Sequence, residues 1–399
     1  MSKFTLISHI LPPSPSGQAA ILFRLLGGLL PDTYCMISSC DYNNNISDNS
    51  SSAKLLGRYY KLRSILRLPE FNRSWLFAFS IFINALIGIY WRALQIKRIA
   101  LKEHSTALVA CTGDLYDLPA TYLASKWTGL PLVSYLFDDF RFQWTGLYRT
   151  IATWLEPAIL RHSCGVIVPN EFLQQEYQKR YGTNSVVIHN PCVLSNLLTL
   201  DTAPRMFIRD QIHIVYTGSV YHAHFDAFRN LITAIRLLDR SDIKLHIYTS
   251  QPESILKHHG IFGPMVDYHP HIDQTEVAAV NRQADILFLP LAFNSPIPEV
   301  IKTSSPGKTG EYLTAGRPIL VHAPDDCFIS WYFRHHQCGV VVSDQNPGAL
   351  SIAIYKLISD VDMNQSLCAR ARIMAENDFN VDVLADTFSK YIIACGNVI

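Results

Sequence analysis

The sequence predicts an α/β protein made of two doubly wound domains, each built on a parallel sheet. Three observations support this fold class. The length of 399 residues is enough for two domains that each bury a core. Short apolar runs alternate with amphipathic stretches along most of the chain, which is typical of βαβ units. This alternation stops after His189-Asn190-Pro191 and starts again near Ile212, which indicates a boundary between two such domains.

The first domain is expected over residues 1–192. Its predicted strands are short apolar runs, as in the buried strands of a parallel sheet. They are residues 5–10, 107–111, 132–136, 165–169 and 186–189. Amphipathic stretches at 118–127 and 171–181 predict helices between these strands. The polar segment 41–52 has low complexity and is typical of an exposed loop.

The second domain is expected over residues 212–375, after a linker at 193–211 that lacks clear periodicity. The pattern predicts strands at 212–216, 244–248, 286–289, 318–322 and 339–342. It predicts helices at 227–238, 274–283 and 306–315. Residues 376–399 are expected to form a C-terminal helix that packs back on the first domain. Doubly wound sheets bind ligands at the carboxyl ends of their strands, so two facing sheets would form a cleft.

Composition excludes several classes of protein. The net charge of +1 gives no overall field that would attract nucleic acid. The nine cysteines form no C-x-x-C pair, so neither a disulfide framework nor a structural zinc site is expected. A reducing cytosol fits this cysteine usage. The first residues, M-S-K-F-T-L-I-S, have no signal-peptide layout, so a cytoplasmic location is expected.

Charge is uneven around one apolar segment. Residues 54–102 contain ten basic side chains and a single acid, Glu70. Within them, the eighteen residues 74–91 are almost wholly apolar, which is the lower limit for a membrane span. Interruptions at Ser80 and Asn84 favour an internal helix. Two alternatives remain open, namely a true span and a peripheral surface that lies on anionic lipid through 54–102.

The most informative segment is 303–320, which reads T-S-S-P-G-K-T-G-E-Y-L-T-A-G-R-P-I-L. Ser305 followed by Pro306 predicts a helix that begins there, capped by the serine. A helix start offers unpaired N–H groups and partial positive charge, which suit a diphosphate. Lys308 lies in that first turn, where the helix itself does not favour a cation, so its presence indicates an anion nearby. Glu311 is on the same helical face and can accept hydrogen bonds from two neighbouring ribose hydroxyls.

The segment has two other interpretations. Gly307-Lys308-Thr309 resembles the end of a phosphate-binding P-loop, but that motif needs a glycine where this chain has Lys302. An ordinary capped helix with a surface lysine and glutamate also fits the segment. No G-x-G-x-x-G follows any predicted strand, so the sequence carries no dinucleotide fingerprint.

The same segment resembles the donor-binding helix of family-4-type GT-B glycosyltransferases, the glycosyl transferases group 1, which often reads S-x-P-x-K-x-x-E-Y-L-A-x-G-x-P-I. Gly17, after the first strand, resembles that family's glycine turn between the domains. Three further segments resemble the family in the same order along the chain. They are 188–191 at the crossover, 214–219 at the opening strand and glycine turn, and 284–290 before the donor loop. The resemblance implies two Rossmann-like domains facing across a cleft.

Carried over by position, the resemblance implies that Glu311 binds the donor ribose. It implies that four N–H groups hold the diphosphate, while Lys308 stabilises the leaving group. The four belong to Gly218, Ser219, Ser304 and Ser305. His271 lies where the family contacts the base, and Thr303 stands where it often has a glutamate near the sugar. The Arg and Lys that usually follow the glycine turn are absent, and Lys308 is expected to replace their charge, with His222 or His224 as weaker candidates.

Two neighbouring acids are candidates for acid/base chemistry in the first domain. Asp138 and Asp139 follow the predicted strand 132–136 and should point towards the cleft. Either could orient or deprotonate the acceptor hydroxyl. Capping of a loop or helix is an alternative of equal weight.

No metal and no bound cofactor are expected. Asp360-Val361-Asp362 is the only D-x-D in the chain and fits a solvated loop. His222 and His224 with Asp226 have the chemistry of metal ligands, although loop histidines are common in a chain that has fifteen. By resemblance, the reaction is metal-independent and retains the anomeric configuration, and the nucleotide sugar is a co-substrate.

The sequence therefore predicts a glycosyltransferase that moves a sugar from a nucleotide diphosphate donor to a polysaccharide, glycolipid or lipid-linked acceptor. Two alternatives keep the same fold. One is a nucleotide-sugar epimerase or hydrolase, which would need a further acid/base set. The other is a catalytically lapsed binding or scaffold subunit, which the threonine at position 303 and the missing Arg/Lys pair would favour.

Overall fold

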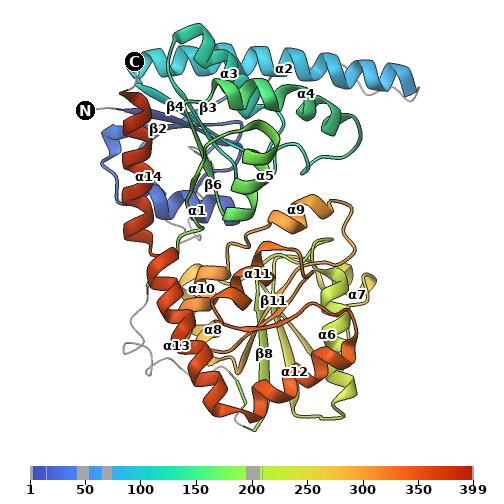
Figure 1. Cartoon of the computed structure of the whole chain (residues 1–399). Helices are drawn as coiled ribbons and strands as arrows, with labels where there is room; N and C mark the ends of the chain where they lie inside the picture. The colour runs from blue at the N-terminus through green and yellow to red at the C-terminus, as the bar shows by residue number, and fades with distance from the viewer. Residues whose placement is uncertain are drawn as a thin grey trace. The chain divides into compact units, whose positions relative to one another are not determined.

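The chain folds into two compact units. The computed structural model describes residues 3–14, 16–42, 54–64, 74–194, 207–208 and 210–397. The first unit comprises Met1–Pro191 together with Val381–Ile399, and the second unit comprises Cys192–Asn380 (Figure 1). The C-terminal segment thus returns to the unit in which the chain began.

The chain passes between the units twice. The two passages meet at Cys192, whose N–H donates to the Phe379 carbonyl at 2.8 Å. Cys192 also forms an isolated parallel bridge with Asn380. Most of the predicted linker at 193–211 lies outside the described residues, because 195–206 and 209 are not among them.

The first unit is built on a seven-stranded parallel sheet with the order β3-β2-β1-β4-β5-β6-β7. The strands are β1 (Phe4–Ile7), β2 (Tyr34–Ser38), β3 (Arg58–Lys61), β4 (Ala107–Cys111), β5 (Leu132–Tyr135), β6 (Gly165–Val168) and β7 (Val186–Val187). Every residue of β1, β4, β5 and β6 is buried. Strands with both faces buried read as continuous apolar runs, which is why the sequence marks these four clearly.

Helices cover both faces of this sheet. They are α1 (Gly17–Leu26), the short 3₁₀ helix η1 (Pro31–Thr33), α2 (Ser74–Lys102), α3 (Asp117–Thr128), α4 (Gly146–His162), α5 (Glu171–Tyr181) and α14 (Val381–Gly396). Leu22 of α1 and Phe388 of α14 pack on one face, against Leu6 and Val109. Helices α2 to α5 supply the opposite face. The sheet is therefore the middle layer of three, as in other doubly wound domains.

The second unit contains a six-stranded parallel sheet with the order β10-β9-β8-β11-β12-β13. The strands are β8 (Ile212–Thr217), β9 (Ile243–Tyr248), β10 (Val266–His269), β11 (Ile286–Pro290), β12 (Ile319–His322) and β13 (Val340–Val342). The helices are α6 (Phe225–Leu237), α7 (Glu253–His258), α8 (Gln274–Gln283), α9 (Pro298–Thr303), α10 (Thr309–Thr314), α11 (Phe328–His335), α12 (Pro347–Ser359) and α13 (Val361–Asp378). Helix α6 shows how they form, because Phe228, Leu231, Ile232 and Ile235 recur at helical spacing and enter the core.

Both sheets have the same strand order when each is counted from its own first strand. The chain first builds outwards in one direction, then returns to the first strand and builds in the other direction. This reversal lies between β1 and β4 in the first unit, and between β8 and β11 in the second unit. In open α/β sheets, ligands bind at the carboxyl ends of the strands beside such a switch point. Each unit therefore has one favoured place for a ligand.

The predicted α/β class with two parallel sheets is confirmed. The sequence patterns missed β2, β3 and β10, of which β3 and β10 are the outermost strands on one side of their sheets. The apolar run at 74–91 is part of a longer helix, α2, that continues to Lys102.

Three histidines form a row across the second sheet. His213 of β8, His246 of β9 and His269 of β10 lie on neighbouring strands. His213 Nδ1 and His246 Nε2 are 2.9 Å apart, and His246 Nδ1 and His269 Nε2 are 3.0 Å apart. Burial lowers the pKa of His246 to about 3, and the charges that His269 and His213 can acquire add to this shift. Protonation of His246 is therefore unfavourable in the folded state.

We predict that this row makes folding sensitive to acid. The pKa of His246 is lower in the folded state than in the unfolded chain, so the unfolded chain binds more protons below pH 6.5. Stability is fully present above pH 6.5 and decreases as the pH falls towards 3. The slope for one such histidine is at most about 1.4 kcal/mol per pH unit. Urea unfolding at pH 7.5 and 5.5 should show a shallower slope for His246→Gln, whereas His258→Gln, an exposed control, should keep the wild-type slope.

Candidate active site

The carboxyl end of β8 meets the start of α10 in the second unit. Gly218 follows β8 with φ of +132°, a conformation that L side chains rarely adopt. A Cβ at this position would lie 3.0 Å from Cε and 3.2 Å from Nζ of Lys308. Two features therefore favour glycine at position 218, namely its backbone angle and the close approach of Lys308.

Two tyrosines hold this arrangement in place. Lys308 Nζ donates a hydrogen bond to the Tyr216 hydroxyl at 2.9 Å and lies 4.3 Å from the centre of the Tyr216 ring. The Tyr216 hydroxyl in turn donates to the Ser219 carbonyl at 2.6 Å. Tyr312 of α10 accepts a hydrogen bond from the Thr217 N–H at 3.1 Å, which ties the helix to the end of the strand. Both tyrosines are fully buried, and the sequence analysis did not identify either of them.

Lys308 is a poorly solvated cation. Burial lowers its pKa to about 8, and the negative charge of Glu311 opposes this shift. No ion pair involves Lys308 within the described part of the chain. An ammonium group that is taken from water without a carboxylate partner favours any anion that can reach it. Glu311 is half-buried on the same helix and has contacts of its own.

The helix does not begin where the sequence predicted. Serine 305 and proline 306 were expected to cap and open it, but α10 starts at Thr309, whose N–H donates to the Pro306 carbonyl at 2.9 Å. A separate helix, α9, occupies Pro298–Thr303. Because α9 ends immediately before the serines, Ser304–Lys308 forms the connection between two short helices. Lys308 stands at the N-cap position of α10 rather than in its first turn.

Two of the four predicted N–H donors already have protein partners. Ser304 N–H donates to the Ile301 carbonyl at 3.3 Å and closes α9. Gly218 N–H donates to the Tyr248 carbonyl at 2.9 Å. Among the described residues, the N–H groups of Ser219 and Gly307 donate to no protein group. These two N–H groups can therefore still donate to a ligand.

The two remaining donor-side candidates are Thr303 and His271. Thr303 is 3% exposed and its hydroxyl donates to the Glu299 carbonyl at 3.2 Å, so it completes α9. His271 is exposed on the loop after β10, at the outer edge of the sheet. No hydrogen bond or ring contact in the described structure joins His271 to Lys308.

The loop before α6 lies beside the same site. His224 is 4% exposed, and burial lowers its pKa well below the usual value, with the charge of Lys308 adding to the shift. It is therefore neutral and cannot replace the missing basic residues. The Asp226 carboxylate accepts from the N–H groups of Phe293 at 3.0 Å and Asn294 at 2.7 Å. These bonds tie the start of α6 to the loop after β11.

Comparison with solved structures shows the same fold over the whole chain. A glycosyltransferase from Rickettsia africae is 12% identical with a TM-score of 0.69, and the match covers 100% of both chains. Anabaena Alr3699/HepE, solved with UDP and glucose, is 12% identical with a TM-score of 0.69 over 99% of this chain and 100% of the other. WaaG, a glycosyltransferase of lipopolysaccharide biosynthesis, is 13% identical with a TM-score of 0.60 over 98% and 99%. The fold is thus GT-B.

No curated protein matches the sequence. Residues 211–360, which form most of the second unit, match the family model described as "Glycosyl transferases group 1". Over these residues the chain resembles the group 1 glycosyltransferases. Such enzymes use nucleotide-sugar donors, and the matched residues include Gly218, Lys308 and Glu311.

In the first unit, the two candidate acids Asp138 and Asp139 differ sharply in their partners. Asp139 forms an ion pair with Arg180 and accepts from the N–H groups of Arg141 and Phe142, both at 3.2 Å. Arg180 also reaches Glu156 at 3.5 Å. Asp139 is therefore part of a buried structural network, as the capping alternative predicted.

Asp138 has no such partners. Within the described residues, no hydrogen bond or ion pair involves its carboxylate. Burial raises its pKa to about 7, and the neighbouring charge of Asp139 raises it further. A carboxylate with a pKa near neutrality can take up and release a proton under working conditions. Asp138 follows β5 at the carboxyl edge of the sheet.

A second polar cluster lies at the switch point of the first sheet. Arg92 of α2 pairs with Asp114 and Asp117 beside the end of β4. Burial raises the pKa of Asp117 to about 8, with Asp114 adding to the shift and Arg92 opposing it. Gly113 has φ of +134°, and a Cβ there would lie 2.1 Å from Cε1 of His9. The position of His9 over Gly113 is set by the fold and could not be foreseen from the sequence.

Gly17 lies on the other side of this unit's switch point. It is the first residue of α1, capped by Ser16, whose hydroxyl accepts from the Ala19 N–H at 3.2 Å. A Cβ at Gly17 would meet nothing within 4 Å. The glycine is therefore not needed for packing, and space beside the helix start is open.

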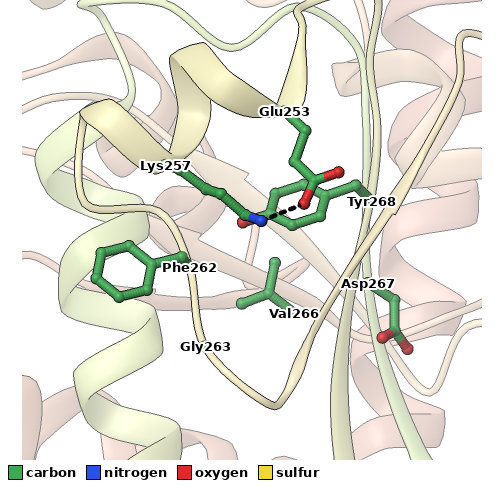
Figure 2. A pocket seen from close by; sticks show the side chains of 7 residues that line it. All are labelled: Glu253, Lys257, Phe262, Gly263, Val266, Asp267 and Tyr268. Carbon is green, nitrogen blue, oxygen red and sulfur yellow. Dashed lines mark ion pairs between the residues drawn. The ribbon is translucent and has the colours of Figure 1, made fainter.

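A surface pocket of about 510 Å³ lies elsewhere in the second unit, between α7 and β10. Figure 2 shows Glu253 and Lys257 of α7 reaching over Tyr268, with the two charges paired at 2.6 Å. None of its lining residues belongs to the Lys308 site. Its one cation, Lys257, already pairs with Glu253, and Asp267 adds a second carboxylate, so the pocket has little to offer a diphosphate.

Metal ligands do not converge in the described structure. No group of three His, Cys, Asp or Glu side chains among the described residues is arranged to hold an ion. Asp360 accepts from the Met363 N–H at 2.9 Å and caps α13. Asp362 follows in the first turn of that helix.

We predict opposite effects on stability for the two acids. The pKa of Asp138 is about 7 in the folded state against an ordinary value of 3.8 for the unfolded chain, so its charge opposes folding above pH 7. Asp138→Asn should stabilise the protein at pH 8 by about 1–2 kcal/mol, allowing for the solvent that reaches this half-buried group. The gain should shrink as the pH falls towards 4. Asp139→Asn should instead cost about 3 kcal/mol, because it breaks a buried ion pair. Urea unfolding at pH 8 and pH 4.5 measures both, and a destabilising Asp138→Asn would contradict the assignment.

Proposed function

We propose that the chain is a glycosyltransferase that binds the diphosphate of its donor at Lys308 and acts without a metal ion. The observation that carries the proposal is the cation itself. Lys308 is half-buried, has a pKa of about 8 and lies against Gly218 at the carboxyl end of β8, beside the switch point of the sheet. An anion at this position would restore the solvation that the ammonium group loses on folding.

Lys308 would then act on the leaving group. Cleavage of the bond between the sugar and the diphosphate leaves negative charge on the diphosphate oxygens. A fixed cation and oriented N–H groups stabilise that charge in the transition state, and a removed donor of this kind typically costs two to four kcal/mol, about 10²–10³ in rate. Lys308, Ser219 N–H and Gly307 N–H supply such groups from this chain. A divalent ion is not needed for this stabilisation.

Glu311 is assigned to the ribose of the donor. It lies one turn after Lys308 on α10, and its carboxylate can accept from both hydroxyls of the sugar. The solved Anabaena protein contains UDP, so uridine nucleotides are the first donors to test.

Asp138 is assigned to the acceptor hydroxyl. Its raised pKa, near neutrality, suits a group that accepts a proton in one step and releases it in the next. Asp139 is left to its structural ion pair. We further propose that the configuration at the sugar carbon is retained and that the acceptor is a glycan or a lipid-linked sugar, in line with the role of WaaG in lipopolysaccharide biosynthesis.

Nucleotide binding tests the donor site. We predict that UDP raises the melting temperature of the wild-type protein, as any ligand specific to the folded state does. Lys308→Met should weaken UDP binding at least about tenfold, because it removes a charge-assisted contact worth about 1.5–3 kcal/mol. Lys308→Arg should keep more of the affinity, and Lys356→Met, an exposed control, should match the wild type.

The pH dependence of UDP binding tests the role of Lys308, and turnover in the presence of a chelator tests whether a metal ion is needed. Affinity for UDP should fall as the pH rises through about 8, because the ammonium group is then lost. Glu311→Gln should weaken binding of UDP more than binding of inorganic pyrophosphate, which has no ribose. Turnover that persists in EDTA supports the metal-free reaction. Binding without transfer to any glycan acceptor would instead indicate a lapsed subunit.

A further inference from the structure

Helix α2 carries two apolar stripes, only one of which faces the core. The buried stripe packs on the sheet and on α3, and consists of Ile81, Ala85, Ile89, Ala93, Ile96 and Ala100. The other stripe faces solvent and consists of Phe79, Phe82, Leu86, Tyr90, Leu94 and Leu101. Steps of three, four or seven residues keep each stripe on one side of a helix. An amphipathic helix needs only the first stripe, so the second requires another explanation.

The exposed stripe is large and aromatic. Phe79, Leu86 and Tyr90 are 55%, 54% and 55% exposed, which is unusual for side chains of this size. Neighbouring helices extend it. Trp154 of α4 is 66% exposed and its ring centre lies 5.8 Å from that of Phe82. The ring centre of Trp127 of α3 lies 5.4 Å from that of Tyr90. The stripe is therefore continuous across three helices, which Figure 1 shows beside one another.

Charge on the same three helices has one sign. Helices α2, α3 and α4 contain two acids, Asp117 and Glu156. Both side chains are 1% exposed and paired with arginines. Exposed cations occur on all three helices. They are Arg98 and Lys102 on α2, Lys126 on α3 and Arg161 on α4. The aromatic stripe is thus bordered by positive charge.

The basic residues of β3, Arg58 and Lys61, add less positive charge to this surface than the sequence suggested. Arg58 pairs with Glu103 at 3.2 Å, and Lys61 pairs with Asp41 at 3.1 Å. Arg92 is held by two aspartates. These cations are largely neutralised within the chain. The surface that remains positive lies on the three helices and not on β3.

We propose that α2, with the adjoining faces of α3 and α4, lies on an anionic lipid surface as an interfacial helix. Exposed aromatic rings enter the boundary between headgroups and acyl chains, while lysine and arginine contact the anionic headgroups. Charge complementarity favours lipid over a second copy of this chain, because two such faces would repel each other.

The structure also distinguishes lying on a membrane from crossing one. Within the described residues, Leu76–Lys102 is the one helix long and apolar enough to span, with a mean hydropathy of 1.6. Its buried stripe, however, belongs to the core clusters of the sheet. A spanning helix would have to leave that core and expose the apolar face of β1, β2 and β4. The interfacial arrangement keeps the core intact and uses only the stripe that is already exposed.

Vesicle binding tests the proposal. The wild-type protein should sediment with vesicles that contain 30% phosphatidylglycerol in phosphatidylcholine, and less with phosphatidylcholine alone. Binding should weaken between about 0.1 and 0.5 M salt, because charge contributes to it. The triple variant F79E/L86E/Y90E should bind at least about tenfold more weakly, since each glutamate adds repulsion and removes an apolar contact. Charge reversal by Arg98→Glu with Lys126→Glu should weaken binding to the anionic vesicles only.

A matched triple variant provides the control. I352E/Y355E/I373E replaces three apolar residues of α12 and α13 that are 60%, 57% and 52% exposed in the second unit. It should sediment as the wild type does. UDP binding should survive in both triple variants, so a failure at the lipid surface is distinguishable from a failure of the donor site. On anionic vesicles, tryptophan emission should shift to the blue, and Trp154→Phe should reduce the shift.

Three results would overturn the proposal. One is wild-type protein that stays in solution with every vesicle. Another is unchanged vesicle binding by F79E/L86E/Y90E. The third is a wild-type dimer in light scattering that becomes monomeric in this variant, because the stripe would then join two copies of the chain.

Discussion

A half-buried ammonium group without an ion pair is costly, and the proposed diphosphate site is built around one, that of Lys308. The free energy needed to desolvate Lys308 is offset in part by the Tyr216 hydroxyl and ring, which replace water with weaker contacts. Gly218 allows the lysine to come so close, because any side chain there would collide with it. The residual cost would favour an anion beside Lys308, as the proposed site requires. A fully solvated lysine, or one paired with a carboxylate, would bind a diphosphate less well.

The sequence predicted most of the strands that are buried on both faces, although it missed the fully buried strand Tyr34–Ser38. Strands such as Ala107–Cys111 and Ile286–Pro290 are continuous apolar runs, and no other element gives that pattern over so few residues. The strand Arg58–Lys61 could not be recognised, because as an edge strand it reads R-Y-Y-K and owes its place to pairing with β2. Val266–His269 is the corresponding edge strand of the second sheet. Their strand structure comes from neighbours that are distant in sequence.

The proposed donor site shows the same contrast between residues that a local sequence pattern indicates and residues whose partners only the fold brings together. Lys308 and Glu311 were proposed as site residues because a lysine beside a helix start is unfavourable unless an anion is near. The start of the helix was placed three residues too early, because Ser-Pro is a common opening and α9 gives no strong periodic signal in six residues. Tyr216 and Tyr312 were missed because buried tyrosines normally look like core residues. Their hydroxyl partners are backbone groups and a lysine that only the fold brings together.

The two sheets share a feature that local sequence does not reveal, a glycine that makes room for a titratable side chain. Each has a glycine of strongly positive φ at its switch point, Gly218 after the first strand of one sheet and Gly113 after the fourth-numbered strand of the other. In each case the missing side chain leaves room for a titratable group from another segment, Lys308 over Gly218 and His9 over Gly113. Neither group forms an ion pair in the described structure, and burial lowers the pKa of both. In the first unit, Arg92 extends this cluster to α2, so the helix that carries the aromatic stripe also fixes the carboxyl edge of β4. One arginine and two aspartates thus join α2 to the carboxyl edge of β4, beside the switch point where open α/β sheets bind ligands.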